Sequence, residues 1–287
     1  MSSQQQQLVW LITGTSTGLG RQLTLAALAR GDKVIATARA RSIGALDDLK
    51  AKGANTLELD VTAPLDTLKD VAQKAVGIYG RVDVVVNNAG YILIGAIEEN
   101  TPEETYDQFN TNVFGALNVT RAFLPYMRQR KTGTIVWMGS VGGWRSGSTC
   151  GLYCTTKYAL RGISETLHDE ISPLGLRSTC IDFGYFRTNF LNPGHKAPYE
   201  SSIEDYREMV KKGVEALEAY NDNQPGDPVK GVQIIIDVMK GEGVAKDKPF
   251  PKSLQLGTDC YGVVKNAAEE TLRNLEAWKD VTCSTDI

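Results

Sequence analysis

The chain has 287 residues, of which 42% are hydrophobic and 23% charged, and its formal net charge is -3. This balance is typical of a soluble globular protein and leaves room for one large α/β domain. Basic residues are neither in excess nor clustered, which argues against a nucleic-acid partner.

The cysteines and the N-terminal residues argue against metal-binding, disulfide-bonded, secreted and membrane-spanning classes of protein. The five cysteines, at positions 150, 154, 180, 260 and 283, form no C-x-x-C pair, and His168 and His195 are far apart. We therefore expect no metal site, no disulfide framework, and reduced thiols in a cytoplasmic protein. Residues 1–7, "MSSQQQQ", lack the cationic region of a signal peptide and are expected to form a flexible leader. The apolar run that follows is too short to span a bilayer, so no membrane partner is expected.

Apolar runs rich in Val and Ile alternate with helical patterns along the first 184 residues. Strands are expected at residues 8–13, 33–39, 56–61, 82–90, 133–140 and 176–184. Helices are expected at residues 19–31, 43–53, 64–80, 102–130 and 152–173, the fourth of them bent before Pro125. The alternation predicts a doubly wound, Rossmann-like α/β fold, in which a parallel sheet is covered by helices on both faces. Ligands of such a sheet bind beyond the carboxyl ends of its strands.

The pattern changes after residue 191, but it contains no linker long enough to separate a second domain. A loop is expected at residues 191–202 and a turn cluster at 221–228. Helices are expected at 203–220, 229–241 and 260–279, with a short strand at 253–257. We therefore expect residues 8–287 to form a single domain, in which residues 191–250 supply a substrate-binding loop and helices.

A glycine-rich turn follows the first expected strand. "TGTSTGLG" (13–20) places glycines at Gly14, Gly18 and Gly20, where the next helix begins. Gly14 can make a tight turn, Gly18 lets a pyrophosphate approach backbone N–H groups, and Gly20 allows close packing of helix and strand. A plain strand-to-helix turn is the alternative.

Tyr153 and Lys157 lie four residues apart, which places both side chains on one face of a helix. Tyr261 and Lys265 have the same spacing, so the pair alone decides nothing. Ser140 distinguishes the two pairs, because it ends a strand 13 residues before Tyr153 and has no counterpart before Tyr261. We assign the second pair to structure.

Several motifs occur together in one order. "TGTSTGLG", "NNAG" (87–90), Asn112, Ser140, "YCTTK" (153–157) and "FGYFRT" (183–188) resemble the short-chain dehydrogenase/reductase family, in its single-domain branch. The likeness to hydroxysteroid and retinol dehydrogenases is loose. Phe183 stands where the family usually has Pro, a departure that concerns the shape of the pocket rather than the chemistry.

The resemblance implies a catalytic set of Asn112, Ser140, Tyr153 and Lys157. Tyr153 would be the proton donor, Ser140 would hydrogen-bond the substrate oxygen, and Lys157 would hold the ribose hydroxyls. The Lys157 ammonium would also lower the tyrosine pKa. Asn112 would anchor a water relay to the lysine; a buried, hydrogen-bonded Asn is the alternative, and Asn110 is a weaker candidate for the relay.

The resemblance also implies the residues around the ligands. The cofactor would be held by Gly14, Thr15, Ser16, Gly18, Leu19, Gly20, Arg39, Asp60, Val61, Asn88, Ala89, Gly90, Tyr153, Lys157, Gly184, Phe186 and Thr188. The substrate would meet Ser140, Trp144, Tyr153, Tyr185 and Phe190. Asp60 could instead serve the turn after its strand, the loop aromatics could be ordinary packing, and Cys154 is expected to be a small packed residue.

The second expected strand indicates which dinucleotide binds. Ala38 stands at the strand end where relatives that bind NAD usually have an acidic residue, and Arg39 can grip a 2′-phosphate. We therefore expect an NADP(H)-dependent oxidoreductase that interconverts a hydrophobic secondary alcohol and its ketone, or an aldehyde. Dehydration or epimerisation with a retained cofactor is one alternative. A non-catalytic, NADP(H)-binding redox-sensing regulator is another, although it would be expected to lose Ser140, Tyr153 or Lys157. A homodimer is expected, paired through the helices at 102–130 and 152–173.

Overall fold

The computed structural model describes residues 7–191 and 201–287. The expected leader, apart from Gln7, lies outside the described residues, and so do residues 192–200 of the expected loop, His195 included. Seven parallel strands form one sheet in the order β3-β2-β1-β4-β5-β6-β7. They are β1 (Val9–Ile12), β2 (Lys33–Ala38), β3 (Asn55–Glu58), β4 (Val84–Asn87), β5 (Gly133–Met138), β6 (Leu176–Phe183) and β7 (Ser253–Leu256). The predicted doubly wound sheet is confirmed.

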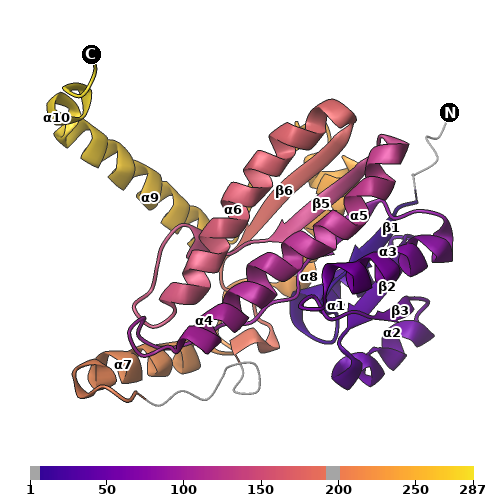
Figure 1. The fold of residues 1–287 in the computed structure, drawn as a ribbon, viewed down its shortest axis with the longest axis horizontal. Coiled ribbons are helices and arrows are strands. Elements are labelled where there is room, and N and C mark those ends of the chain that lie inside the picture. The colour runs from indigo at the N-terminus through magenta and orange to yellow at the C-terminus, as the bar shows by residue number, and fades with distance from the viewer. Residues whose placement is uncertain (1–6, 192–200) are drawn as a thin grey trace.

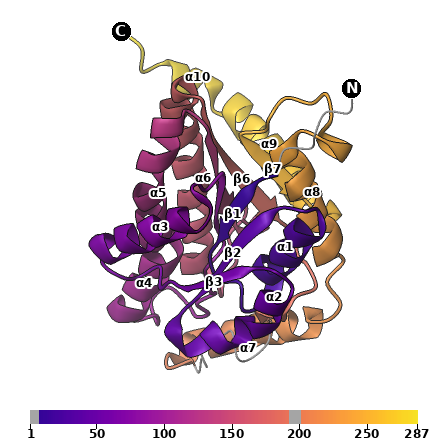
Figure 2. The ribbon, with the colours of Figure 1, turned by 90° about the vertical axis from the view of Figure 1, so that its right-hand side faces the viewer.

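Helices cover both faces of this sheet (Figures 1 and 2). The α-helices are α1 (Gly18–Ala29), α2 (Asp47–Ala51), α3 (Leu65–Tyr79), α4 (Pro102–Phe109), α5 (Ala116–Arg130), α6 (Gly151–Ile171), α7 (Glu204–Tyr220), α8 (Pro228–Lys240), α9 (Thr258–Ala277) and α10 (Lys279–Cys283). Figure 2 shows α3, α5 and α6 on one side of the strands and α1 and α8 on the other. The strand order turns back between β1 and β4, which is where doubly wound sheets bind their ligands.

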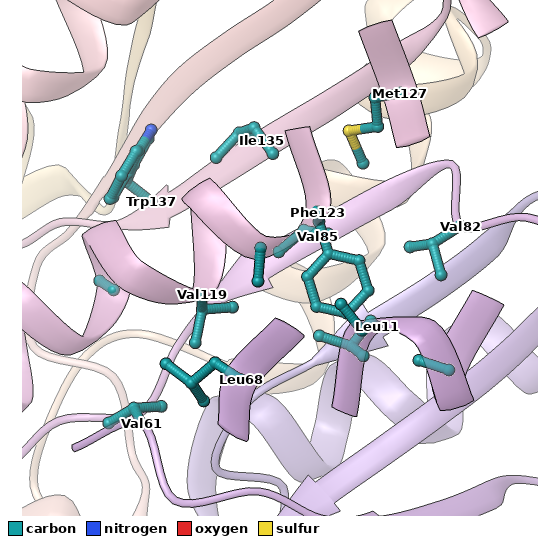
Figure 3. Close-up of a cluster of buried hydrophobic side chains, with 14 of the residues drawn as sticks. Leu11, Val61, Leu68, Val82, Val85, Val119, Phe123, Met127, Ile135 and Trp137 are labelled. Atoms are coloured by element: carbon teal, nitrogen blue, oxygen red, sulfur yellow. The ribbon is translucent and has the colours of Figure 1, made fainter. Parts of the chain in front are cut away.

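Two hydrophobic clusters fill the space between the sheet and its helices. Successive residues of a strand point to opposite faces, so Leu11 packs with Leu68 and Phe123 beneath α3 and α5. Figure 3 shows this cluster, with Phe123 lying between α5 and the strands. Trp10, next to Leu11, faces the other way and packs with Ile235 of α8. Strands buried on both faces explain why their sequences are continuous apolar runs.

Two expected helices differ from what the structure contains. The helix expected at 102–130 is interrupted by a π-helical turn at Asn110–Gly115, whereas Pro125 lies inside α5 without ending it. The extra residue of a π turn rotates the following side chains. Here it points Asn112 inward, and Gly115 lies so close to Val61 that a Cβ would be 2.7 Å from its carbonyl oxygen. The helix expected at 43–53 is instead a 3₁₀ helix at Ala40–Leu46 followed by the short α2.

A buried ion pair joins the start of the sheet to α8. Lys240 Nζ lies 2.7 Å from Asp32 Oδ1, and neither side chain is more than 6% exposed. Asp32 also accepts hydrogen bonds from the Trp10 indole at 3.0 Å and from the Leu8 backbone at 3.0 Å. Burial of both charges makes this pair sensitive to the loss of either partner.

The last long helix projects from the body. α9 begins beside β7 and extends outward, with the C-terminus at its far end (Figure 1). From Ala268 onward every residue is exposed. Leu272 is 65% exposed and Leu275 54% exposed, so the outer part of α9 carries apolar side chains into solvent.

Candidate active site

A cleft of about 1020 Å³ lies at the carboxyl ends of the strands. Residues that follow β1, β2, β3, β4, β5 and β6 all contribute to its walls, as expected for a doubly wound sheet. The predicted site residues that line it are Gly14, Ser16, Gly18, Leu19, Arg39, Asp60, Val61, Asn88, Ala89, Gly90, Ser140, Tyr153, Lys157, Gly184, Tyr185, Phe186, Thr188 and Phe190. The fold therefore brings most of the predicted set to one place.

The turn before α1 forms a cradle that side chains would block. Gly14 has φ +69°, and a Cβ there would lie 3.0 Å from the Ala89 backbone. A Cβ on Gly20 would lie 2.4 Å from the Asn88 amide nitrogen, which itself donates to the Thr13 carbonyl at 2.8 Å. Thr17 does not cap α1 with its side chain, so N–H groups of the first helical turn are left for an anionic ligand. These residues fit a dinucleotide pyrophosphate.

Thr15 does not belong to the cofactor-facing set predicted for this turn. It is fully buried, and its hydroxyl and backbone N–H both donate to the Thr37 carbonyl, at 3.1 and 2.9 Å. Its side chain therefore ties the glycine turn to β2 and is not available as a donor to a phosphate. Ser16, the next residue, does line the cleft.

Two arginines line the cleft just after β2. Arg39 follows Ala38 directly after β2, and both Arg39 and Arg41 line the cleft. Within residues 7–191 and 201–287 neither guanidinium forms an ion pair with a carboxylate. Asp60 lines the cleft nearby, and its Oδ1 accepts from the Thr62 N–H and hydroxyl at 3.0 and 2.7 Å. It therefore serves the turn after β3 as well.

Ser140, Tyr153 and Lys157 meet at the middle of the cleft. Ser140 follows the end of β5 and accepts a 3.0 Å hydrogen bond from the Gly142 N–H, which fixes its hydroxyl. Tyr153 lies in the first turn of α6, is 8% exposed and is hydrogen-bonded to Ser140. Lys157, one turn along the same helix, donates to the Met138 carbonyl at 2.7 Å. The strand end and the helix start together place a hydroxyl, a phenol and an ammonium at one wall.

The surroundings shift the pKa values of both Tyr153 and Lys157, and the shift of Tyr153 is opposite in direction to the one expected. Burial raises the pKa of Tyr153 above its usual value, and the hydrogen bond with Ser140 only partly opposes this. The predicted lowering by Lys157 is therefore wrong for the protein as described. Lys157 Nζ is held by Met138 and lies 5.5 Å from the centre of the tyrosine ring. Burial also lowers the pKa of Lys157 to about 8, against an opposing effect of the Asp182 carboxylate.

Asn112 is fully buried behind the cleft and does not line it. Its Oδ1 accepts from the Tyr91 N–H at 3.1 Å, and its Nδ2 donates to the Tyr91 carbonyl at 3.0 Å and to Thr156 Oγ1 at 3.2 Å. The side chain thus holds the segment after β4 against α6, next to Tyr153 and Lys157. This corresponds to the buried, hydrogen-bonded alternative, and Asn110, not Asn112, reaches the cleft wall.

Trp144, which was predicted to meet the substrate, is not among the residues that line the cleft. Its indole N–H donates to Asp182 Oδ2 at 2.9 Å, and the Arg161 guanidinium lies 3.3 Å from the centre of its ring. The tryptophan thus contacts the buried Asp182 carboxylate and stacks with Arg161. Gly20, likewise absent from the cleft wall, packs against Asn88.

Sequence reasoning missed several residues of the cleft wall. Arg145 and Cys150 come from the loop before α6, Tyr91 follows β4, and Leu217 and Gln224 come from α7 and the turn after it. Cys150 Sγ lies 3.7 Å from the Sγ of the buried Cys154. Arg145 was detectable as a charge between two catalytic motifs. Leu217 and Gln224 had no signal, because only the packing of α7 brings them to the cleft.

The second tyrosine–lysine pair, Tyr261 and Lys265, does not line the cleft. Tyr261 is 67% exposed on α9, and Lys265 forms an exposed ion pair with Glu269 at 3.8 Å. The assignment of this pair to structure agrees with its surroundings.

The remaining expectations concern metals and membranes. In the part of the chain that the structure describes, no cluster of His, Cys, Asp or Glu is arranged to hold a metal ion. No helix there has the length and apolar character needed to cross a membrane.

Comparison with known proteins places the chain in a family. The family model described as short chain dehydrogenase matches residues 8–197. Oxidoreductase BOA17 of Botryotinia fuckeliana is 31% identical over 282 residues, which is 96% of this chain and 98% of the relative. A short-chain dehydrogenase from Streptomyces avermitilis has a TM-score of 0.87 and 37% identity, with all of both chains covered. The closed form of serine dehydrogenase with NADP⁺ has a TM-score of 0.70 and 25% identity over 87% of this chain and 94% of that one. The glycine cradle, the Ser140–Tyr153–Lys157 wall and these similarities agree: the chain belongs to the short-chain dehydrogenase family and is similar to oxidoreductases.

Proposed function

We propose that the protein is an NADP(H)-dependent oxidoreductase that interconverts a hydrophobic secondary alcohol and its ketone, or an aldehyde. The observation that carries this proposal is the convergence of Ser140, Tyr153 and Lys157 at the centre of a cleft that also holds a pyrophosphate cradle. A redox-sensing regulator without catalysis has no need of a buried phenol hydrogen-bonded to a serine at such a wall. The five free cysteines suit the cytoplasm as its location.

Each residue of the wall has a distinct part in the reaction. When bound, a nicotinamide cofactor supplies or accepts the hydride at the substrate carbon. Tyr153 donates its proton to the substrate oxygen during reduction. The phenol is protonated at neutral pH, and the hydrogen bond with Ser140 lowers its pKa against the opposing effect of burial. Ser140 is oriented by Gly142 and donates its O–H to the same oxygen as negative charge develops there. Lys157 is held by Met138 and binds the ribose hydroxyls.

The arginines at the end of β2 support NADP(H) over NAD(H). Arg39 and Arg41 line the cleft just after β2, and Ala38 supplies no carboxylate to accept from a 2′-hydroxyl or to repel a 2′-phosphate. A guanidinium binds phosphate through paired hydrogen bonds. Serine dehydrogenase, a structural neighbour of this chain, was solved with NADP⁺.

A hydrophobic substrate is supported by the other end of the cleft. Ile92, Phe190, Leu191 and Leu217 line it and supply apolar surface around the carbonyl position next to Tyr153. Such pockets bind a ligand mainly through apolar contact and fix its orientation with a few polar groups.

A panel of ketones, aldehydes and secondary alcohols, followed by NADPH absorbance, tests the activity. Turnover with at least one apolar carbonyl is expected, and NADPH binding without turnover across the panel would favour the regulator. Cofactor choice is tested on wild type and on Ala38→Asp/Arg39→Ala. Because charged hydrogen bonds contribute roughly 1.5–3 kcal/mol, wild type should prefer NADPH by about tenfold to a hundredfold in kcat/KM. The double variant should shift toward NADH, and equal efficiencies in wild type would contradict the assignment.

A further inference from the structure

Two cysteines lie together in the cleft wall beside Tyr153. Cys150 directly precedes α6 and is half-buried, whereas Cys154, at the end of the first turn of α6, is 3% exposed. Both residues line the cleft. Their sulfurs are 3.7 Å apart, and either sulfur can donate its S–H to the other. Both thiols are free, so the structure describes the reduced form of the pair.

The pair adjoins the side chains that carry the proposed reaction. Tyr153 and Cys154 belong to one buried apolar cluster, and Cys150 packs against it. A Cβ on Gly142 would lie 3.2 Å from Cys154 Sγ and 3.4 Å from Ser140 Oγ. The same point is 3.5 Å from Tyr153 Cε1. A change of bonding at these sulfurs therefore takes place within the packing that holds Tyr153.

The surroundings favour the loss of one proton from the pair. The hydrogen bond between the sulfurs lowers the pKa of Cys154 to about 7 and raises the pKa of Cys150, so one proton remains between them near neutral pH. The Gly147 N–H and the Arg145 charge each act to lower the pKa of both thiols. When the shared proton is on Cys154, the more exposed Cys150 carries the thiolate. Thiolates in partly exposed, positively charged surroundings are the cysteines that oxidants attack.

We propose that Cys150 and Cys154 form a modification site, a dithiol that a hydroperoxide converts to a disulfide and thereby inactivates the cleft. A hydroperoxide that enters the cleft meets Cys150, and Cys154 resolves the product from its buried position. The loss of activity rests on the proposed reductase function, whereas the formation of the disulfide does not.

The oxidation has two steps. The Cys150 thiolate attacks the terminal oxygen of the hydroperoxide ROOH; the O–O bond breaks, a sulfenic acid forms, and RO⁻ takes a proton from solvent and leaves as the alcohol. The Cys154 sulfur then attacks the Cys150 sulfur, so that the S–S bond forms, the S–O bond breaks and the oxygen leaves as water with the Cys154 proton. Two thiols thus lose two electrons, and the hydroperoxide is reduced to an alcohol and water.

Closure of the disulfide disturbs the first turn of α6. The Cys154 N–H donates to the Cys150 carbonyl at 2.9 Å, as in a regular helical turn. Residues four apart on a helix have Cβ atoms about 5–6 Å apart, whereas a disulfide requires about 3.5–4.5 Å. The turn must therefore contract, and Tyr153 lies within it. Misplacement of a catalytic group by about 1 Å costs on the order of a hundredfold in rate.

The test follows one tryptic peptide. Trypsin cuts after Arg145 and Lys157, so the peptide 146–157 contains Cys150 and Cys154 and no other cysteine. The reduced protein is treated with hydrogen peroxide and then with an alkylating agent, and the peptide mass and the NADPH-dependent reduction of a carbonyl are measured. In wild type the peptide should lose two hydrogen atoms and escape alkylation, and activity should fall about a hundredfold. Dithiothreitol should restore both the thiols and the activity.

Three variants define the part of each sulfur, and the activity of each is compared with its own untreated sample. Cys150→Ser removes the sulfur that the peroxide reaches, so its peptide mass and its activity should not change on treatment. Cys154→Ser removes the resolving sulfur, so Cys150 should gain oxygen atoms and the peptide should lose no hydrogen. Cys283, an exposed thiol on α10 at the far end of the projecting helix (Figure 1), supplies the matched control. Cys283→Ser should be inactivated like wild type.

Other results would overturn the proposal. One is a wild-type peptide that keeps both thiols under peroxide. Another is a wild-type peptide that gains oxygen without losing hydrogen, since Cys154 would then not resolve the sulfenic acid. Equal loss of activity in wild type and in Cys150→Ser would place the sensitive group elsewhere.

The peptide mass separates this proposal from the proposed function, because it needs no turnover. A disulfide formed by peroxide in a protein that reduces no carbonyl would contradict the proposed reductase and leave the dithiol site standing. An active reductase whose peptide keeps both thiols would overturn the dithiol site and leave the reductase standing.

Discussion

Tyr153 and Tyr261 have the same spacing to a lysine and very different surroundings. Tyr153 is buried at the cleft beside Ser140, whereas Tyr261 is exposed on α9. Tyr153→Phe removes only the hydroxyl that transfers the proton, and general acid catalysis is worth roughly 10²–10⁴-fold. We therefore expect turnover to fall at least a hundredfold while NADPH still binds. Tyr261→Phe should stay within twofold of wild type. Residual activity above a tenth of wild type in purified Tyr153→Phe would refute the assignment.

The lowered pKa of Lys157 predicts how activity depends on pH. Burial disfavours the ammonium, so the side chain is charged below about pH 8 and loses its proton above that value. Because a charged Lys157 binds the ribose hydroxyls best, kcat/KM for NADPH should fall as the pH rises through about 8. Asp182 raises this pKa, so Asp182→Asn should move the fall to lower pH. A profile that stays flat to pH 9, or a shift in the opposite direction, would contradict this reading.

For single residues, the sequence predicted which side chains form the candidate site better than it predicted their contacts and pKa values. Ser140, Tyr153 and Lys157 were recognisable from their spacing and from the order of the motifs, because the end of one strand and the start of the next helix had to meet at one edge of the sheet. The raised pKa of Tyr153 was not, because it depends on how deeply the first turn of α6 is buried. The contacts of Trp144 were not recognisable for a similar reason. Its partner Asp182 is 38 residues away in sequence, and only the fold brings them together.

Among the elements, α8 is joined by a buried ion pair to Asp32, the residue before β2. Lys240 and Asp32 are both buried, and removing Lys240 leaves the Asp32 carboxylate with neutral donors at Leu8 and Trp10 but without this cationic partner. Lys240→Met should therefore lower the free energy of unfolding by about 3 kcal/mol, read from urea denaturation. Lys69→Met, which removes an exposed ion pair with Asp66, is the matched control and should leave the unfolding midpoint unchanged. Equal changes in the free energy of unfolding for the two substitutions would show that the buried ion pair contributes no more to stability than the exposed one.

Element boundaries show what periodicity can and cannot predict. Strands rich in Val and Ile and the helices between them were identifiable, because burial on one or two faces leaves a pattern in the sequence. The π turn at Asn110–Gly115 was not, since the expected break at Pro125 rested on a local rule. The actual break serves contacts of Asn112 with Tyr91 and of Gly115 with Val61. These partners are distant in sequence and leave no periodic signal.

For the whole molecule, α4 and α6 carry exposed aromatic side chains that could form the interface of the expected dimer. Tyr106 of α4, Phe114 of the π turn and Tyr158 of α6 are 60%, 43% and 42% exposed. Exposed aromatic residues on neighbouring helices suit a two-fold interface, in which the same patch meets itself. Light scattering should give a mass of about twice 31.3 kDa, and Tyr106→Glu/Phe114→Glu should reduce it to the monomer mass. A monomer at micromolar concentration in wild type would exclude the dimer.

The projecting part of α9 has a consequence for the protein in concentrated solution. With a net charge of only -3 and a pI near 5.6, repulsion between molecules is weak and vanishes in mildly acidic buffer. Attraction between the exposed Leu272, Leu275 and Trp278 side chains of different molecules is then unopposed. We therefore expect precipitation near the pI to depend on the apolar side chains at the outer end of α9. Colloidal stability can accordingly be adjusted on the outer turns of α9, leaving the chemistry of the cleft untouched.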